Sequence, residues 1–282
     1  MKYSELHYER IDVDKSRETM DALIERFNNA NSAEEQISVF KEADEVSREY
    51  MSYSAIASLN FSRDINDEPA KAEKDYYDSI GPDMQEIYDK LDKAVDGSKF
   101  KADLSDKWGD TFLKQIELQL KTFDPKIKDL LKQEIDLRND YTTLTAGAKI
   151  DFEGKTYNLS GLGPFHTNKD RKVRRSSFKA RFEWFEKNAD EFDVLYDKLV
   201  KLRHKIATTL GYDNFIELGY KRMGRSDYGP NEVGNFRKQI VEHVVPVVTR
   251  LHEQKKAILG LDHLYMYDGI NLQVGIYSVG IF

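Results

Sequence analysis

The sequence predicts a mainly α-helical protein that contains one small β-hairpin. Over most of the 282 residues, apolar side chains recur at steps of three and four, which is the period of a helix with one buried face. Only 6 prolines are present, too few to favour a turn-rich all-β chain. Alternation of apolar and polar residues, which is typical of a half-buried strand, stands out near residues 150–159.

Helical periodicity begins near residue 15 and continues to about residue 135. The acidic and polar stretch NDEPAKAEKD, residues 66–75, predicts a loop. A turn is expected at Gly97, and Pro125 predicts a break in the long segment that starts at Asp103. The apolar residues at helical spacing in this part are Met20, Leu23, Phe27, Ile37, Phe40, Ala43, Val46, Met84, Ile87, Leu91, Phe112, Ile116, Leu120, Ile127, Leu130, Leu131 and Ile135.

The segment IDFEGKTYNL has a different period. Ile150 and Phe152 fall on one face of a strand, and Tyr157 and Leu159 fall on one face of the next. A Glu-Gly pair separates the two strands, and a glycine at that place permits the tight turn of a hairpin. The segment therefore predicts a β-hairpin.

Helix returns after the hairpin. An apolar stripe runs through residues 178–210 and is expected to end at Gly211, because glycine commonly follows the last helical residue. Four phenylalanines of this stripe keep helical spacing and are expected to be buried: Phe178, Phe182, Phe185 and Phe192.

A last helix is expected to start at Pro230, to kink at Pro246 and to stop at Gly260. The final segment, INLQVGIYSVGIF, carries no charge and reads either as a strand without a partner or as a short tail in a shifted frame. The expected organisation is an N-terminal helical region at 1–110, a helical lobe with the hairpin at 111–269, and an atypical apolar tail at 270–282.

Composition excludes several classes of protein. With 43 basic and 50 acidic residues the net charge is −7, so no global basic field exists to attract nucleic acid. There is no cysteine, which excludes disulfides, thiolate metal sites and cysteine nucleophiles. The N-terminus lacks the apolar core of a signal peptide. No apolar run reaches the roughly 18 residues of a membrane span. A cytoplasmic protein without membrane contact is expected.

The stretch HEQKK begins like the zinc-peptidase motif HExxH, in which two histidines four residues apart bind zinc and the glutamate acts as general base. Lys256 stands where the second histidine is required, and a protonated amine has no lone pair for a metal. We interpret His252 and Glu253 as an ordinary helix surface. The remaining histidines lack metal-ligand spacing, so no catalytic and no metal-binding residue is assigned.

The basic stretch KDRKVRRSSFKARF, residues 169–182, allows a nucleic-acid face, but five acidic residues follow directly. A solvated helical face that supplies ion pairs is the preferred interpretation.

The glycine-rich stretch GYKRMGRSDYGP predicts a tight junction between two helices. Its guanidinium groups and phenols suit a peptide carboxylate or backbone. The competing interpretation is that Arg222 and Arg225 cap helix carbonyls and pair with Asp227. The candidate substrate-binding residues are Tyr220, Arg222, Arg225 and Tyr228.

Three segments occur in a fixed order: FEGKTYNLSGLGPF, LGYDNFIELGYKRMGRSDYG and LGLDHLYMYDG. In these segments the chain resembles the oligoendopeptidase F family, bacterial relatives of thimet oligopeptidase, and the resemblance covers most of residues 1 to about 270. The resemblance implies a largely helical lobe of a zinc metallopeptidase that cuts short oligopeptides. The family's HExxH helix lies after the YD segment, so its zinc ligands and catalytic glutamate match no residue of this sequence.

Three functions stay open. The chain is expected to be the N-terminal lobe of such a peptidase, inactive alone and dependent on a separate catalytic chain. The alternatives are a non-catalytic module that binds peptides or proteins, and a truncated or frameshifted remnant. No cofactor is expected in this chain, although zinc is implied for the full-length family. Self-association through an exposed apolar surface is also expected.

Overall fold

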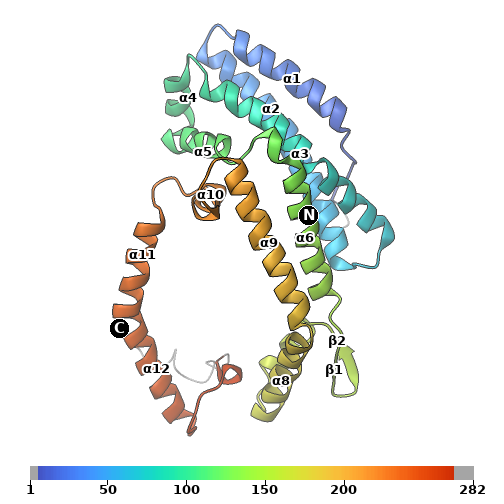
Figure 1. Ribbon diagram of the computed structural model, residues 1–282, viewed down its shortest axis with the longest axis vertical. Coiled ribbons are helices and arrows are strands. Elements are labelled where there is room, and N and C mark those ends of the chain that lie inside the picture. The colour runs from blue at the N-terminus through green and yellow to red at the C-terminus, as the bar shows by residue number, and fades with distance from the viewer. Residues whose placement is uncertain (1–5, 270–282) are drawn as a thin grey trace. The chain divides into compact units, whose positions relative to one another are not determined.

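The computed structural model describes residues 6–269 of the chain, and these are largely helical (Figure 1). The apolar tail expected at 270–282 lies outside the described residues. Tertiary contacts divide the chain into two compact units. Unit 1 comprises the residues up to 140 together with 195–227, and unit 2 comprises 141–194 together with the residues from 228. The sequence-based boundary near residue 110 stays a prediction.

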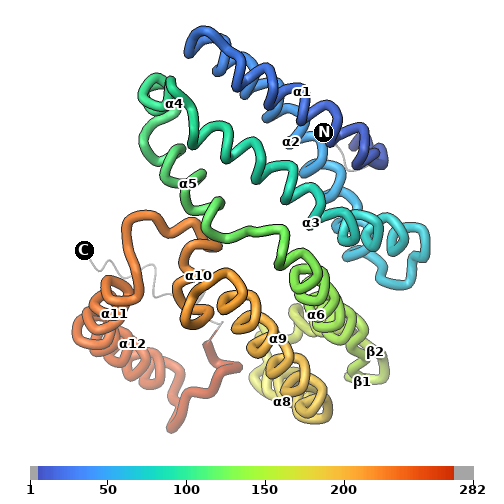
Figure 2. The backbone as a smooth tube through the Cα atoms, turned by 45° about the horizontal axis from the view of Figure 1, so that its top comes forward, coloured from blue at the N-terminus to red at the C-terminus, as the bar shows by residue number. Residues whose placement is uncertain are grey.

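Unit 1 begins with three long helices that lie side by side, α1 Val13–Asn29, α2 Ala33–Arg63 and α3 Glu68–Asp96 (Figures 1 and 2). Their apolar faces form a common core, as the helical spacing predicts. The side chains that are at most 1% exposed in this core are Met20, Phe27, Ala43, Ala57, Met84, Ile87, Val95 and Leu104.

The loop predicted at 66–75 is much shorter than expected. Helix α3 starts at Glu68, because Asp67 accepts a hydrogen bond from the backbone N–H of Ala70 at 3.0 Å and so caps the first turn. Pro69 lies in that turn, where a helix needs no N–H donor from it. The prediction of a loop was wrong from Glu68 onward, since polar residues also suit the exposed start of a helix.

The rest of unit 1 consists of shorter helices together with the first part of α6, up to residue 140, and the later part of α9, from residue 195. Gly109, with φ of 86°, separates α4 from α5, and Pro125 opens a short 3-10 turn before α6, at the break predicted there. A second apolar cluster joins α6, α9 and α10. The bounds are α4 Lys101–Trp108, α5 Asp110–Leu120, η2 Pro125–Ile127, α6 Lys128–Ala146, α9 Ala189–Thr209 and α10 Phe215–Arg222.

Unit 2 contains the predicted hairpin, which the structure confirms. Strands β1 Ile150–Phe152 and β2 Lys155–Tyr157 pair antiparallel. The two turn residues, Glu153 and Gly154, have φ of 48° and 77°, the left-handed conformation that a two-residue hairpin turn needs. Helices α7 Gly163–His166 and α8 Arg171–Lys187 follow the hairpin.

The expected burial of the four phenylalanines is wrong. The apolar stripe is not one helix, because the chain breaks at Asn188 between α8 and α9. Phe182 is 47% exposed, and the other three are half-buried. Neighbouring rings contact one another along the stripe, with ring centroids 5.5 Å apart for Phe185 and Phe192. Within the described part of unit 2, spacing alone did not determine burial, since no layer covers the outer side of these rings.

The last helical segment of unit 2 is a rod of three pieces, α11 Pro230–Gln239, the π segment η3 Ile240–Val244 and α12 Val245–Ile258 (Figures 1 and 2). The disturbance predicted at Pro246 takes the form of this π segment, whose wider turn accommodates the missing proline donor. Gly260, with φ of 62°, follows the end of the helix as predicted. We call this segment the α11–α12 rod.

The α11–α12 rod exposes apolar side chains along its length. Lys255 is the one buried residue between 230 and 258. The exposed large apolar residues are Phe236, Val241, Val244, Val245, Val247, Val248, Leu251 and Ile258.

Among residues 6–269, none of the helices is long and apolar enough to cross a membrane.

Candidate functional site

The glycine-rich junction after α10 is tight, as the sequence predicts. Gly224 adopts φ of +65°, and a Cβ there would lie 2.9 Å from Oε1 of Gln115. Nε2 of Gln115 donates to the carbonyl oxygen of Gly224 at 2.9 Å. The left-handed backbone conformation favours glycine at this position, and any Cβ would also displace the end of the Gln115 side chain. The junction is thereby fixed to α5 of unit 1.

Arg222, at the end of α10, belongs to a cluster that the sequence did not indicate. Its Nη1 donates to Oε2 of Glu134 at 2.9 Å, and Nε of Arg203 donates to Oε1 of the same carboxylate at 2.7 Å. Both guanidinium carbons lie over the ring of Phe215, at 5.7 and 5.5 Å from its centroid. We call these four residues the Glu134 cluster.

Sequence reasoning missed Glu134 and Arg203 because they lie 88 and 19 positions before Arg222 in the chain. One signal was available. Glu134 interrupts the apolar stripe of α6, four residues after the buried Leu130, and a carboxylate at a core-facing position requires a partner. The stripe could therefore have suggested a buried ion pair, but not the identity of its arginines.

The electrostatics of Glu134 follow from its surroundings. The residue is 7% exposed, and burial by itself raises the pKa of its carboxyl. The hydrogen bond from Arg203 and the charge of Arg222 outweigh burial, so the pKa lies below the usual range. Glu134 is therefore ionised, and with two guanidinium groups the cluster carries a net charge of +1.

The other candidate residues are distributed differently. Arg225 lies over the ring of Tyr220, with 4.5 Å from its guanidinium carbon to the centroid. Asp227 accepts from Lys114 at 2.9 Å and from Ser226 at 2.7 Å, so it is not the partner of Arg222. The structure brings Tyr220 and Arg225 together and places Arg222 in the Glu134 cluster.

Tyr228, the fourth candidate, is 49% exposed and belongs to unit 2. Substrate binding by these four residues stays a prediction.

A second carboxylate cluster lies in unit 2, at the YD segment. Arg171 donates from Nε and Nη2 to the two oxygens of Asp268, both at 2.9 Å, and Arg174 lies 3.3 Å from Oδ1. Lys255 donates to the backbone carbonyl oxygens of Asp268 and Gly269. Asp268 is 1% exposed. We call Arg171, Arg174, Lys255 and Asp268 the Asp268 cluster.

The hydrogen bond from Arg171 is the main cause of the low pKa of Asp268, which lies at about 2. Burial of the Lys255 amine, in contrast, lowers the pKa of that lysine. Both arginines come from the basic stretch at 169–182. Both arginines supply ion pairs, as the preferred interpretation expects, although their acid is distant in sequence. Arg174 is 6% exposed, so for this residue the expected solvated face is wrong.

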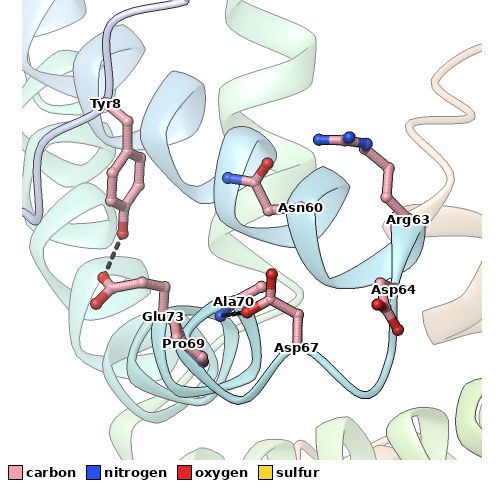
Figure 3. A pocket seen from close by; sticks show the side chains of 8 residues that line it. All are labelled: Tyr8, Asn60, Arg63, Asp64, Asp67, Pro69, Ala70 and Glu73. Carbon is pink, nitrogen blue, oxygen red and sulfur yellow. Dashed lines mark hydrogen bonds between the residues drawn. The ribbon is translucent and has the colours of Figure 1, made fainter. Parts of the chain in front are cut away.

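A separate hollow of about 550 Å³ lies between the ends of α2 and α3 in unit 1. Figure 3 shows Arg63 and Asn60 on one side of it and Glu73 with Tyr8 on another. Glu73 accepts from the phenol of Tyr8 and from Arg10, and Asp67 caps α3. These two carboxylates therefore hold the fold together, and the hollow carries no evident chemistry of its own. The residues that line it are Tyr8, Asn60, Arg63, Asp64, Asp67, Pro69, Ala70 and Glu73.

Two family profiles match the chain. The profile of the peptidase M3 N-terminal domain matches residues 3–123, and that of peptidase family M3 matches residues 165–272. A solved structure of PZ peptidase A with an inhibitor is 37% identical and has a TM-score of 0.89 over 95% of this chain. The chain belongs to peptidase family M3.

Solved structures described as oligoendopeptidase F agree with this assignment. One is 37% identical with a TM-score of 0.90, and another, from Bacillus anthracis, is 34% identical with a TM-score of 0.88. Each is matched over 96% of this chain. A comparison with curated proteins gives no significant match.

The chain spans about half the length of these M3 relatives. It covers 48% of the PZ peptidase A chain, and 48% and 50% of the two oligoendopeptidase F chains. The N-terminal domain profile matches from residue 3, so the chain corresponds to an N-terminal portion of an M3 peptidase. The resemblance to oligoendopeptidase F and the helical lobe that it implies are thus confirmed.

M3 peptidases are generally zinc-dependent, but the described residues of this chain do not fit a zinc site. Among residues 6–269, no three side chains of histidine, aspartate or glutamate gather in an arrangement that could hold a metal ion. Lys256 forms an ion pair with Glu253 at 2.6 Å, and His252 is exposed on α12. His252 and Glu253 therefore lie on an ordinary helix surface, whereas Lys255 of the same stretch is buried in the Asp268 cluster. No step of catalysis is assigned to the stretch.

Proposed function

We propose that this chain supplies the N-terminal portion of a zinc-dependent oligopeptidase, in which it binds and orients short peptides. The zinc ligands and the catalytic glutamate would belong to a further polypeptide segment. The observation that carries the proposal is the match, at 34–37% identity and TM-scores of 0.88–0.90, to about half of each of three M3 peptidase chains.

The α11–α12 rod supports the need for a further segment. Its exposed apolar residues form two adjacent stripes along the helix. Val244 and Val247 belong to one stripe, and their direct neighbours Val245 and Val248 belong to the other. A helix that is apolar around much of its circumference is normally buried within a larger assembly. We propose that the zinc-bearing segment packs on this rod and that, without it, copies of the chain self-associate there.

The absence of cysteine suits a reducing compartment, and we place the protein in the cytoplasm.

Reconstitution tests the proposed function. The purified chain would be mixed with the unmatched half of the Bacillus anthracis relative, and cleavage of a fluorogenic oligopeptide would be followed. We expect no cleavage by the chain alone, cleavage by the mixture, and loss of cleavage when a chelator removes zinc. A Val244→Asp, Val248→Asp variant of the chain should fail to reconstitute activity.

Two results would contradict the proposal. Cleavage by the chain alone that survives a chelator would place catalysis on its own residues. A stable complex of the two halves that binds zinc but leaves every oligopeptide intact would favour the alternative, a non-catalytic module that binds peptides or proteins.

A further inference from the structure

The Glu134 cluster has more positive charge and more hydrogen-bond donors than its own residues use. Each guanidinium has five N–H donors, and each bonds Glu134 through a single nitrogen. Within residues 6–269, neither Arg203 nor Arg222 donates to any other acceptor. The cluster therefore has unused donors on two adjacent arginines and an uncompensated charge of +1.

These donors are held in fixed positions. Glu134 is buried on α6 and orients both guanidinium groups. Phe215, beneath them, packs against the apolar cluster of α6, α9 and α10, whose members Ile206 and Leu218 are 0% exposed. Donors on a rigid support lose little entropy when they bind a ligand. The site is thus organised before any ligand arrives.

The site is also accessible. The side chain of Arg203 is 38% exposed and that of Arg222 is 23% exposed, whereas the carboxylate that orients them is 9% exposed. A ligand can therefore reach the two arginines without displacing Glu134. Partial removal from water strengthens a charge-assisted hydrogen bond, so these arginines should bind an anion more strongly than arginines on an open surface.

We propose that Arg203 and Arg222 bind the terminal carboxylate of a peptide, with Phe215 as the apolar floor of the site. A planar carboxylate matches the planar guanidinium and accepts two parallel hydrogen bonds from it. The choice of a peptide as the source of the carboxylate rests on the proposed function. The binding of a carboxylate rests on the geometry of the cluster alone.

Binding of matched peptides tests the assignment. An acetylated tetrapeptide with a free C-terminal carboxylate would be titrated into the intact chain by calorimetry, in parallel with the same peptide as its C-terminal amide. The amide should bind at least tenfold more weakly. The free acid should also shift the side-chain Nε–H signals of Arg203 and Arg222 in ¹⁵N spectra, and the amide should not.

Substitutions then locate the site. Arg203→Gln should weaken binding of the free acid about tenfold, and Arg203→Lys should weaken it less, because a lysine keeps the charge but loses the planar pair of donors. Arg26→Gln is the matched control, since Arg26 also forms an arginine–carboxylate pair, with Glu42, but on the surface of the α1–α2 pair. It should leave binding unchanged. Thermal unfolding of each variant confirms that the fold is retained.

The inference is wrong if the free acid and the amide bind equally, if neither binds, or if a folded Arg203→Gln variant binds as the parent does. Inorganic phosphate that binds the cluster more tightly than the peptide acid would also overturn the peptide assignment. These binding results do not depend on zinc or on reconstitution. A carboxylate site in a chain that never reconstitutes activity would contradict only the proposed function.

Discussion

The Glu134 and Asp268 clusters contain the same kinds of residue, but their arginines differ in the hydrogen bonds that they make. In each, two arginines bind one buried carboxylate. In the Asp268 cluster, Arg174 also donates to three backbone carbonyl oxygens, those of Tyr267, Asn168 and Lys169. In the Glu134 cluster, the arginines bond no acceptor except Glu134 among the described residues.

The difference separates a structural role from a binding role. An arginine whose donors are bonded to buried backbone carbonyls fixes the chain around it and has little left for a ligand. Arg174, whose side chain is 7% exposed, is such a residue. Arg203, with a side chain 38% exposed, is not. Residue type and the presence of an ion pair do not distinguish the structural arginine from the binding one. The acceptor to which each N–H group donates does.

The largest expected effect on the free energy of unfolding comes from removing the Asp268 carboxylate. Asp268→Ala leaves Arg174 and Lys255, 6% and 5% exposed, without the charge that compensates them. Removing one partner of a buried ion pair typically costs about 3 to 5 kcal/mol. Chemical denaturation should show a loss of this size. A loss below about 1 kcal/mol, the value of a surface pair, would remove the contrast between the clusters.

Low pH should remove the stabilisation that the Asp268 carboxylate provides. The folded-state pKa of Asp268, about 2, lies below its ordinary value of 3.8. The resulting stabilisation, about 2 kcal/mol, is complete above pH 4 and is lost as pH falls toward 2. The stability difference between the parent and Asp268→Asn, followed by denaturation at successive pH values, should therefore shrink over this window. A difference that stays constant from pH 5 to 2 would show that the carboxylate is not the cause.

The half-buried carboxyl of Asp92 shows what happens without an arginine. Burial, followed by the nearby Asp89, raises the pKa of Asp92 from 3.8 to about 7. Its folded-state pKa is thus raised, so its contribution is favourable below pH 4 and is lost as pH rises through 7. Asp92→Asn should stabilise the protein at pH 8 by about 1 to 2 kcal/mol and should give no gain at pH 4. Equal melting temperatures of the parent and variant at pH 8 would contradict this explanation.

The smallest expected effect on the free energy of unfolding comes from a substitution in the Glu134 cluster. Arg203→Gln leaves Glu134 with Arg222, and the lost pair is partly exposed, so the free energy of unfolding should change by less than about 1 kcal/mol. Arg174→Gln should cost at least twice as much, because it leaves backbone carbonyl oxygens without donors. Denaturation of the two variants side by side measures the difference. Similar losses would mean that Arg203 is as structural as Arg174.

Local features of this protein were determined by its sequence. The helical period of residues such as Met20, Phe27 and Ile87 predicted the core of the first three helices, and a Glu-Gly pair predicted the hairpin turn. Pro246 and Gly260 predicted where the last helix is disturbed and where it ends. These predictions succeeded because backbone sterics and hydrophobic periodicity act over a few neighbouring residues.

Burial and partnership were decided only by the tertiary structure. Phe182 has the spacing of a core residue but is 47% exposed, because spacing does not say whether another layer covers a face. Arg222 was singled out for its place in a glycine-rich junction, yet its partner Glu134 lies 88 residues away. The core-facing position of Glu134 indicates that it needs a partner, but long-range packing decides which distant arginine comes close to it, and the sequence has no local signal of that choice.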